Sequence, residues 1–469
     1  MRVATLLAAL AFVVVPNAHA GGPGLIIGAT EDSTKSTTMA VAKAQMDLLV
    51  AAGFSADRVT EEWAPGQTAV PATGRQVLEN LAAAAKLDGV TIICVVMNHG
   101  SATTPLTPTD QADFASYAAS IARAVPSVRI FVVGNEPNLN RYWLPQYNDD
   151  GSDAAAPAYE SLLAGTYDAL KGVSSGITVL GGALAPRGGD APSTVRPTHN
   201  PTVFIHDMGQ ALLDSGRTTP IMDGFDMHPY EDNSSIAPVA GTHPNSTTIA
   251  LADYDKLVAA LGDAFGNYSL PIWYDEFGVE TQIPPQWESQ YTGTEPTTIH
   301  PVPETTQAAY YRQAIQLAFC QPNVRALMLF HTVDEADHAA WQSGLYYANS
   351  TTAKASLAPT RLAIQQSRRG VVTHCDGLEL PVTPRIVQKG DVLTLSCGLD
   401  CDYVAQLYRG TKLVRGVRGR AVGGEPKTLS IRVPTTKGSY RLQVSGVNPV
   451  NPAPPKPRFV RLRPVVEAG

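Results

Sequence analysis

Residues 131–138 read Phe-Val-Val-Gly-Asn-Glu-Pro-Asn, a short apolar run that ends abruptly in polar residues. Residues 272–278, Ile-Trp-Tyr-Asp-Glu-Phe-Gly, repeat the arrangement. Strands that are buried on both faces, as in parallel sheets, appear as continuous apolar runs. Each stretch therefore predicts a buried strand with one glutamate, Glu136 or Glu276, at its carboxyl end.

Six further runs of this kind lie between residues 25 and 332, and longer amphipathic stretches separate them. The eight predicted strands are Leu25–Ala29, Asp57–Trp63, Val90–Asn98, Val128–Asn135, Ile177–Ala183, Gly224–Tyr230, Pro271–Glu276 and Val324–Thr332. The stretches with helical character include Ser36–Ala52, Pro108–Val125, Ala158–Lys171 and Thr305–Phe319. Eightfold alternation of strand and helix predicts an α/β fold, a (β/α)₈ TIM barrel over residues 21–370. A doubly wound open sheet would give a similar alternation.

The pattern changes after about residue 370, where short strand-like runs alternate with Gly and Pro turns. The predicted strands are Asp391–Cys397, Tyr403–Arg409, Thr428–Val433, Ser439–Val444 and Phe459–Val466. Short strands at such spacing are typical of a small all-β sandwich. We therefore predict an Ig-like sandwich domain over residues 376–469.

The first twenty residues have the form of an export signal. Arg2 gives a positive start, Leu6–Val15 is an unbroken apolar run, and Ala18-His19-Ala20 has the form that signal peptidases cleave. The apolar run is too short to span a bilayer. We therefore predict that residues 1–20 are a signal peptide, that the protein is secreted and that it has no membrane span. An N-terminal membrane anchor is the alternative.

Charge is distributed unevenly along the chain. The total is −7, whereas residues 376–469 contain 15 Lys/Arg and 7 Asp/Glu, a net +8 that leaves −15 for the remainder. The acidic total argues against a nucleic-acid partner. A basic C-terminal domain on an exported protein is suited to an anionic polymer, and the alternative is a solvated surface without a partner.

The chain has five cysteines, and export favours disulfides. We expect Cys397 to pair with Cys401 in a small loop, and Cys320 with Cys375 beside the linker. Cys94 lies within a strand-like apolar run, which predicts a buried free thiol. Spacing alone does not fix such a connectivity. Since no His lies at ligand spacing from Cys397 and Cys401, a zinc site is not predicted.

The two glutamates fall where a barrel carries its active site, at the carboxyl ends of the strands. Glu136 ends the fourth strand and Glu276 the seventh, so they can face each other across the barrel mouth. Retaining glycoside hydrolysis uses two carboxyl groups about 5–5.5 Å apart, one protonated and one ionised. Each motif also has a simpler reading: Asn-Glu-Pro can start a helix, and Asp275-Glu276 can be an acidic loop.

The stretches Phe131–Asn138 and Ile272–Gly278 resemble the acid/base and nucleophile strands of the clan of retaining (β/α)₈ glycoside hydrolases. That clan includes cellulases, mannanases and β-xylosidases. The resemblance covers about residues 25 to 370 and implies Glu136 as acid/base and Glu276 as nucleophile. It also implies that Asn135 binds the hydroxyl beside the anomeric centre, and that neither metal nor cofactor is needed.

Other predicted strand ends carry further candidate substrate-binding residues. His228 and Tyr230 resemble the clan's strand-six His and Tyr, and Tyr230 is placed to hydrogen-bond Glu276. Arg58 resembles the strand-two Arg that supports the nucleophile. Asn98 and His99 end the third strand and are candidates for binding a sugar hydroxyl. Residues of these types are also common as satisfied core groups or solvated charges.

Strand eight departs from the clan pattern, in which a Trp that stacks on sugar commonly ends the strand. The run here ends Leu329-Phe330-His331-Thr332, and Trp341 follows nine residues later as the candidate for that role. Trp63 and Trp143 also follow strand ends, where an aromatic face either stacks on sugar or packs a loop.

Together these features predict a secreted retaining glycoside hydrolase that cleaves O-glycosidic bonds of a poly- or oligosaccharide by double displacement. The alternative is a non-catalytic carbohydrate-binding or cell-wall-associated protein on a barrel scaffold. That alternative would be favoured by loss of one of the two glutamates, and both are present. No His-Glu-x-x-His motif of a zinc peptidase occurs.

Overall fold

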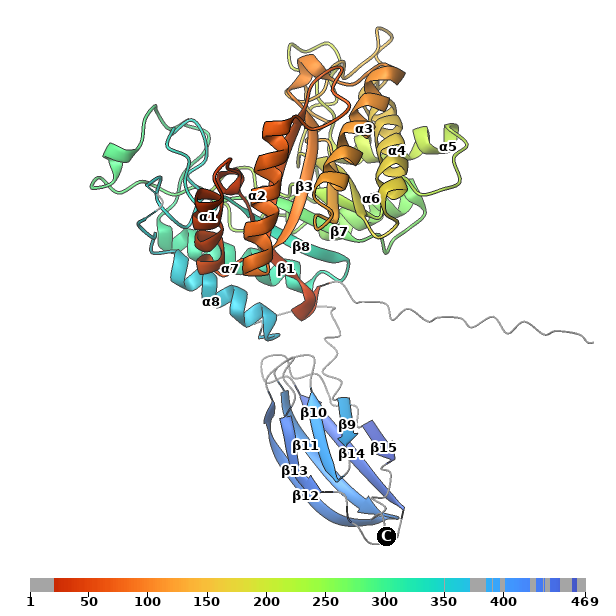
Figure 1. Cartoon of the computed structure of the whole chain (residues 1–469), viewed down its shortest axis with the longest axis vertical. Coiled ribbons are helices and arrows are strands. Elements are labelled where there is room, and N and C mark those ends of the chain that lie inside the picture. The colour runs from red at the N-terminus through yellow and green to blue at the C-terminus, as the bar shows by residue number, and fades with distance from the viewer. Residues whose placement is uncertain are drawn as a thin grey trace, which may run out of the picture.

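The computed structural model contains a barrel and a smaller β-sheet domain (Figure 1). It describes residues 21–349, 351–371, 385–389, 391–396, 401–421, 427–432, 434, 439–447 and 458–461.

Eight parallel strands close into a barrel in the order of the sequence. Their bounds are β1 Ile26–Thr30, β2 Ala56–Trp63, β3 Thr91–Asn98, β4 Ile130–Val133, β5 Thr178–Leu184, β6 Gly224–Met227, β7 Ile272–Phe277 and β8 Val324–Phe330. β1 pairs with β8 along its whole length, with Ile26 opposite Ala326 and Thr30 opposite Phe330. This closure confirms the TIM barrel and excludes the open doubly wound sheet.

An α-helix follows each strand, and the helices lie outside the ring of strands (Figure 1). Their bounds are α1 Met39–Ala52, α2 Ala72–Asp88, α3 Pro108–Ala124, α4 Ala155–Val173, α5 Pro201–Asp214, α6 Tyr254–Phe265, α7 Glu304–Cys320 and α8 Leu357–Arg368. Among the described residues, the 3₁₀ helices are Gly22–Gly24, Asp32–Thr34, Ser101–Thr103 and Glu288–Gln290. Local sequence sets the ends: the side chain of Thr107 accepts from the Asp110 N–H at the start of α3, and Gly53, with φ of 99°, ends α1.

Strand β3 shows why the strands are apolar throughout. Ile93 and Val95 pack in the barrel interior, whereas Cys94 and Val96 pack in the layer between strands and helices. Alternate residues of one strand point to opposite faces, and here both faces are covered. A continuous apolar run is therefore the expected sequence of such a strand.

Strands β4 and β6 end earlier than predicted, directly before the candidate site residues. β4 ends at Val133 because Gly134 takes a φ of 80°, a conformation that glycine adopts without a steric penalty. β6 ends at Met227, so His228 and Tyr230 follow the strand. β7 instead continues through Glu276 to Phe277.

The C-terminal domain consists of two antiparallel sheets, β13-β10-β9 and β12-β11-β14-β15, as predicted for a sandwich. The strand bounds are β9 Arg385–Lys389, β10 Val392–Ser396, β11 Cys401–Arg409, β12 Lys412–Ala421, β13 Lys427–Arg432, β14 Tyr440–Val447 and β15 Arg458–Arg461. Sequence analysis missed β9 and β12. Strand β12 has an exposed, arginine-rich sequence without an apolar run, so hydrophobic pattern gave no signal for it.

Several predictions concern residues outside the described part of the chain. They are the signal peptide at residues 1–20 and the cysteine partners Cys375 and Cys397, so export and the disulfide pairing stay predictions. Cys94 is a buried free thiol, as predicted, and neither Cys320 nor Cys401 is one. Among the described residues, no helix combines the length and apolar character needed to cross a membrane.

Candidate active site

Glu136 is presented by a sharp turn at the end of β4. Gly134 has a φ of 80° and Glu136 itself a φ of 41°, which is uncommon for a residue with a side chain. The Glu136 N–H donates to the Ala183 carbonyl at 2.8 Å, so the turn is tied to the end of β5. Backbone strain of this kind persists only where the surroundings impose it, and it is concentrated at functional sites.

Glu276 lies on β7 and is almost fully buried. Its Oε1 is 2.9 Å from Arg58 Nη2, and its Oε2 accepts a hydrogen bond of 3.1 Å from the Tyr230 hydroxyl. Burial raises the pKa of Glu276, while His228 and Arg58 act in the opposite direction. The predicted contacts of Arg58 and Tyr230 with this glutamate are both present.

Glu136 and Glu276 lie close together, with His228 between them. One carboxylate oxygen of each and a ring nitrogen of His228 all lie within 4.8 Å of one another. His228 Nδ1 is 3.1 Å from Glu136 and 3.5 Å from Glu276. Burial alone would lower the pKa of His228, but the carboxylates of Glu276 and Asp275 outweigh it and raise that pKa well above its usual value.

Asp275 is the main site residue whose role sequence reasoning missed. Its carboxylate is fully buried, 3.0 Å from Arg58 Nε and 2.8 Å from His228 Nε2. Burial would raise its pKa, yet Arg58 and His228 hold the pKa of Asp275 well below its usual range. Asp275 thus holds the two cationic groups that contact the glutamates. Asp226 behind it has a pKa raised by burial and by the charge of Asp275.

Asn135 completes this network. Its side-chain oxygen accepts a 2.9 Å hydrogen bond from Arg58 Nη2. The guanidinium of Arg58 therefore contacts Asn135, which follows β4, and Asp275 and Glu276, which lie on β7. Such a planar group with several fixed donors sets the relative positions of its partners.

A cavity of about 980 Å³ opens at the barrel mouth. Most predicted site residues line it, namely Arg58, Asn135, Glu136, Tyr230, Glu276 and Trp341. Further lining residues that sequence analysis did not single out include Asp32, Glu62, Arg141, Tyr142, Arg187, Glu231, Asp232, Glu280, His331 and Glu335. Their common signal in the sequence is only that they lie at or after the end of a predicted strand, which many unrelated residues also do.

Asn98 and His99 are not among the lining residues, and their predicted role in binding sugar stays a prediction. The Asn98 amide donates to the carbonyls of Gly100 and Tyr142, both at 2.8 Å, and thereby holds the loop. His99 is exposed and pairs with Glu62 at 2.6 Å. Trp63 and Trp143 are fully buried, and both therefore pack the barrel and its loops.

Trp341 reaches the cavity from the loop after β8. Its ring lies 5.0 Å from Tyr230 and 5.1 Å from Phe330, measured between ring centroids. Since Tyr230 contacts Glu276, this places an aromatic wall beside the candidate nucleophile, and the stacking role of Trp341 stays a prediction. His331 also lines the cavity, with Nδ1 2.9 Å from the Thr30 carbonyl.

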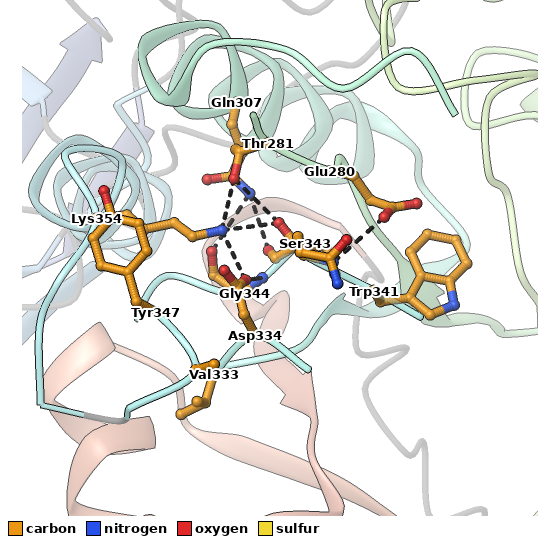
Figure 2. Close-up of polar contacts among 12 residues, drawn as sticks. Glu280, Thr281, Gln307, Val333, Asp334, Trp341, Ser343, Gly344, Tyr347 and Lys354 are labelled. Carbon is orange, nitrogen blue, oxygen red and sulfur yellow. Dashed lines mark hydrogen bonds and ion pairs between the residues drawn. The ribbon is translucent and has the colours of Figure 1, made fainter. Parts of the chain in front are cut away.

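A buried lysine anchors the loop that carries Trp341 (Figure 2). Lys354 Nζ donates to Asp334 Oδ1 at 2.7 Å, to Thr281 Oγ1 at 2.7 Å and to the Gln342 carbonyl at 2.8 Å. Gln342 adjoins Trp341, and its N–H donates to Glu280 Oε2 at 3.4 Å. The ammonium thus joins the loops after β7 and β8 on one side of the cavity.

Two groups of described residues have the donor types of a metal site. They are Glu136, His228 and Glu276, and Asp226, His228 and Asp275. Arg58 is within 3.0 Å of one carboxylate of each group, so the protein itself supplies positive charge beside them. The expected absence of a metal stays a prediction.

Glu231, another lining residue, yields a prediction about pH. Both its carboxylate oxygens are buried without a hydrogen-bond partner, and burial raises its pKa to about 9. A carboxyl whose pKa is higher when folded favours the folded state most at low pH, and this contribution is lost as the pH rises from about 4.5 to about 9. The loss is at most about 1.4 kcal/mol per pH unit for one proton.

We therefore expect Glu231→Gln, which resembles the protonated acid, to unfold at a higher temperature than the wild type at pH 8. The difference should shrink towards pH 5, as measured by melting curves across this range. Glu79→Gln, an exposed glutamate on α2, serves as the control and should change little. A constant difference between Glu231→Gln and wild type at all pH values would contradict the linkage.

No protein-family model matches the chain, and no curated protein is similar enough to count as a relative. Among solved structures it is similar to GH5_18 from Streptomyces cattleya in complex with GlcNAc, with 16% identity, a TM-score of 0.51, and coverage of 74% of this chain and 81% of that one. A glucosidase from Croceicoccus marinus gives 11% identity, a TM-score of 0.51, and coverage of 88% and 94%.

Bacteroides uniformis beta-glucuronidase 2 matches with 11% identity, a TM-score of 0.47 and coverage of 94% of this chain. The chain spans only 46% of that protein's length. At identities this low, the two matches with a TM-score of 0.51 establish a shared fold and no more. The shared fold is a (β/α)₈ barrel, the one implied by the resemblance of the Glu136 and Glu276 motifs.

Proposed function

We propose that this chain is a secreted retaining glycoside hydrolase, with Glu136 as acid/base and Glu276 as nucleophile. The observation that carries the proposal is the pair of glutamates whose carboxylate oxygens lie within 4.8 Å in a cavity at the barrel mouth. A separation of this order suits double displacement, whereas inverting enzymes need about 6.5–9.5 Å for an intervening water.

The contacts of Glu276 suit a nucleophile. Arg58 and the Tyr230 hydroxyl stabilise its negative charge, one on each oxygen. In the proposed first step, a Glu276 oxygen attacks the anomeric carbon and the bond from that carbon to the leaving oxygen breaks. The product is a glycosyl ester of Glu276. In the second step, water attacks the same carbon and releases the Glu276 carboxylate.

The contacts of Glu136 suit the acid/base. Asp275, 2.8 Å from His228 Nε2, favours a proton on that nitrogen. One further proton then lies between His228 Nδ1 and Glu136 Oε1, which are 3.1 Å apart. Because the surrounding carboxylates raise the pKa of His228 well above its usual value, the imidazole holds this proton beside Glu136. We propose that this is the proton that Glu136 gives to the leaving oxygen in the first step. Glu136 then regains a proton from the attacking water in the second step.

The stereochemistry of the product tests the mechanism. We expect the first-formed sugar to have the same anomeric configuration as the substrate, because two displacements at one carbon restore it. NMR of fresh product from an aryl glycoside, recorded before mutarotation, measures the configuration. An inverted product would disprove the double displacement.

Charge around the cavity leads to a prediction about the substrate. Besides the catalytic pair, the lining carboxyl groups include those of Asp32, Glu62, Asp232 and Glu335. Glu231 and Glu280 also line the cavity, but burial raises their pKa to about 9 and about 8, so they add little negative charge at neutral pH. Of the lining arginines, Arg58 is held by Asp275 and Glu276, and Arg187 pairs with Asp232 at 2.9 Å. The guanidinium of Arg141, the third, lies 5.4 Å from the centre of the Tyr142 ring. A substrate carboxylate in this cavity would meet mostly like charges, which oppose binding.

We therefore expect neutral glycosides to be much better substrates than the matching uronides. For any neutral aryl hexoside that is hydrolysed, the aryl uronide of the same sugar series should have a kcat/KM lower by about 100-fold, or about 2.7 kcal/mol. Assays at two salt concentrations measure the electrostatic share, because salt weakens repulsion between exposed charges. Equal kcat/KM values would contradict the prediction.

A further inference from the structure

The four-stranded sheet of the C-terminal domain has one buried face and one exposed face. Along β11, Tyr403, Ala405 and Leu407 are buried in the domain core, whereas Val404 between them is 43% exposed. Paired residues of adjacent antiparallel strands point to the same face. The register therefore assigns each residue of β12 and β14 to the core or to the outer face.

The outer face is rich in basic, amide and aromatic side chains. It contains Val404, Gln406 and Tyr408 of β11, Arg418 and Arg420 of β12, and Arg441, Gln443 and Ser445 of β14. Asp402 is its one acidic residue among these strands, and it pairs with Arg420 at 3.0 Å. Among the described residues, no carboxylate pairs with Arg418. The face therefore has an excess of positive charge.

Protection of a sheet edge explains only part of this charge. β12 is an edge strand, and Lys and Arg on edge strands prevent unwanted pairing with other chains. Arg441, however, lies on β14, which is flanked by β11 and β15. Its guanidinium lies 5.2 Å from the centre of the Tyr408 ring on β11, also an inner strand. The basic residues thus extend across the sheet to strands whose edges are already paired.

We propose that this outer face binds an anionic polysaccharide. Arg418 and Arg441 lie on strands two apart, so about 10 Å of sheet separates their strands. Between them lie Gln406 and Gln443, paired across β11 and β14, and Gly416, which adds no side chain opposite Gln406. Arginines suit carboxylates or sulfates, and amides with an aromatic ring suit sugar hydroxyls and C–H faces.

The choice of a polysaccharide rather than a nucleic acid as the ligand rests on the proposed function. The binding of an acidic polymer of either kind rests only on the side chains of the outer face. A glycosidase that has a second site for the polymer surrounding its substrate is held near that substrate. Its effective concentration at the substrate is therefore higher. The barrel cavity disfavours anionic sugars, so the polymer bound here is a distinct component from the sugar that is hydrolysed.

The test compares binding of the full-length protein to immobilised polygalacturonate and to the same polymer with its carboxyl groups methyl-esterified. Wild-type protein should bind the acidic form, and binding should weaken as salt increases. Arg418→Ala/Arg441→Ala should bind about tenfold more weakly, because two charge contacts are lost. The control is Lys389→Ala/Arg432→Ala on β9 and β13, which removes two exposed cations from the other sheet and should bind nearly as wild type.

Arg418→Lys/Arg441→Lys keeps the charge and should retain most of the binding. Wild-type affinity in the double alanine variant, or equal retention on the esterified polymer, would overturn the proposal. So would tighter binding to duplex DNA than to polygalacturonate at equal salt. Turnover of a small aryl glycoside should be the same in all variants. If wild type binds the acidic polymer but hydrolyses no glycoside, the proposed function fails and this inference stands.

Discussion

Glu276→Ala should abolish turnover of aryl glycosides, with kcat reduced by about 10⁴-fold or more, because no other group can form the covalent intermediate. The fold should survive, since Asp275 remains 3.0 Å from Arg58 and keeps that buried guanidinium paired. Circular dichroism and a melting temperature check the fold, and steady-state kinetics with an aryl glycoside measure the loss.

Azide should restore turnover in Glu276→Ala by attacking the anomeric carbon in place of the missing carboxylate. A single displacement inverts the centre, so the glycosyl azide should have the opposite configuration to the substrate. Glu136→Ala is the matched variant, because it removes the other carboxyl of the pair. There azide replaces water in the second displacement, and the glycosyl azide should retain the configuration of the substrate.

The two variants should also differ in their dependence on the leaving group. Without Glu136, glycosides of acidic phenols should still react in the first step, because such leaving groups need little protonation, whereas alkyl glycosides should not. Without Glu276, both should fail. Near-wild-type activity in either variant, or azide products with the configurations exchanged, would refute the assignment of roles.

The sequence identified the barrel and the glutamate pair because both leave local signals. Strands buried on two faces are apolar throughout, as β3 shows, and each glutamate directly follows or ends such a run. Arg58 and Tyr230 were also found from the strand ends. In a parallel barrel these ends meet at one mouth, so position along the chain translates into position in the site.

Asp275 could not be assigned from the pattern, because consecutive residues of a regular strand point to opposite faces. The pairing of β7 with β8 shifts between Tyr274 and Phe277. Such an irregularity re-aims side chains locally, and here Asp275 and Glu276 both contact Arg58. A register shift of one residue has no signature in composition or periodicity.

Asn98 shows the opposite case, a residue chosen from its place on a strand that does not line the cavity. It does end a strand at the mouth, but its amide is used by the carbonyls of Gly100 and Tyr142. Tyr142 is 44 residues away in the sequence, so this competition for the side chain becomes visible only in the folded chain. The partners of a polar residue, rather than its place on a strand, decide whether it is available to a ligand.

The same limit applies to Lys354. It donates to Thr281, which lies 73 residues away in the sequence, and no sequence motif marks this lysine. Lys354→Met should lower the free energy of unfolding by about 3–5 kcal/mol, the usual cost of removing one partner of a buried ion pair. The loss arises because Asp334 remains buried without its counter-charge, and the Thr281 hydroxyl and Gln342 carbonyl lose their donor. Chemical denaturation monitored by circular dichroism measures it.

Lys256→Met is the matched control, because Lys256 also donates to three groups, the carbonyls of His243, Ser246 and Thr248. That lysine is 25% exposed, so water can replace it and the cost should be about 1 kcal/mol. Only Lys354→Met should also lower kcat/KM at a temperature where both variants are folded. Its loop carries Trp341, which packs on Tyr230 5.0 Å away.

The double variant Lys354→Met/Asp334→Leu separates the cost of a stranded charge from the intrinsic value of the pair. Replacing both partners with apolar residues removes the unpaired carboxylate, so stability should recover towards wild type. Recovery of kcat/KM should be smaller, because the Gln342 carbonyl next to Trp341 still lacks the donor that fixes its position. If stability and kcat/KM recover to the same extent, the ammonium serves folding alone. If Lys354→Met unfolds like wild type, the buried pair does not hold the two loops together.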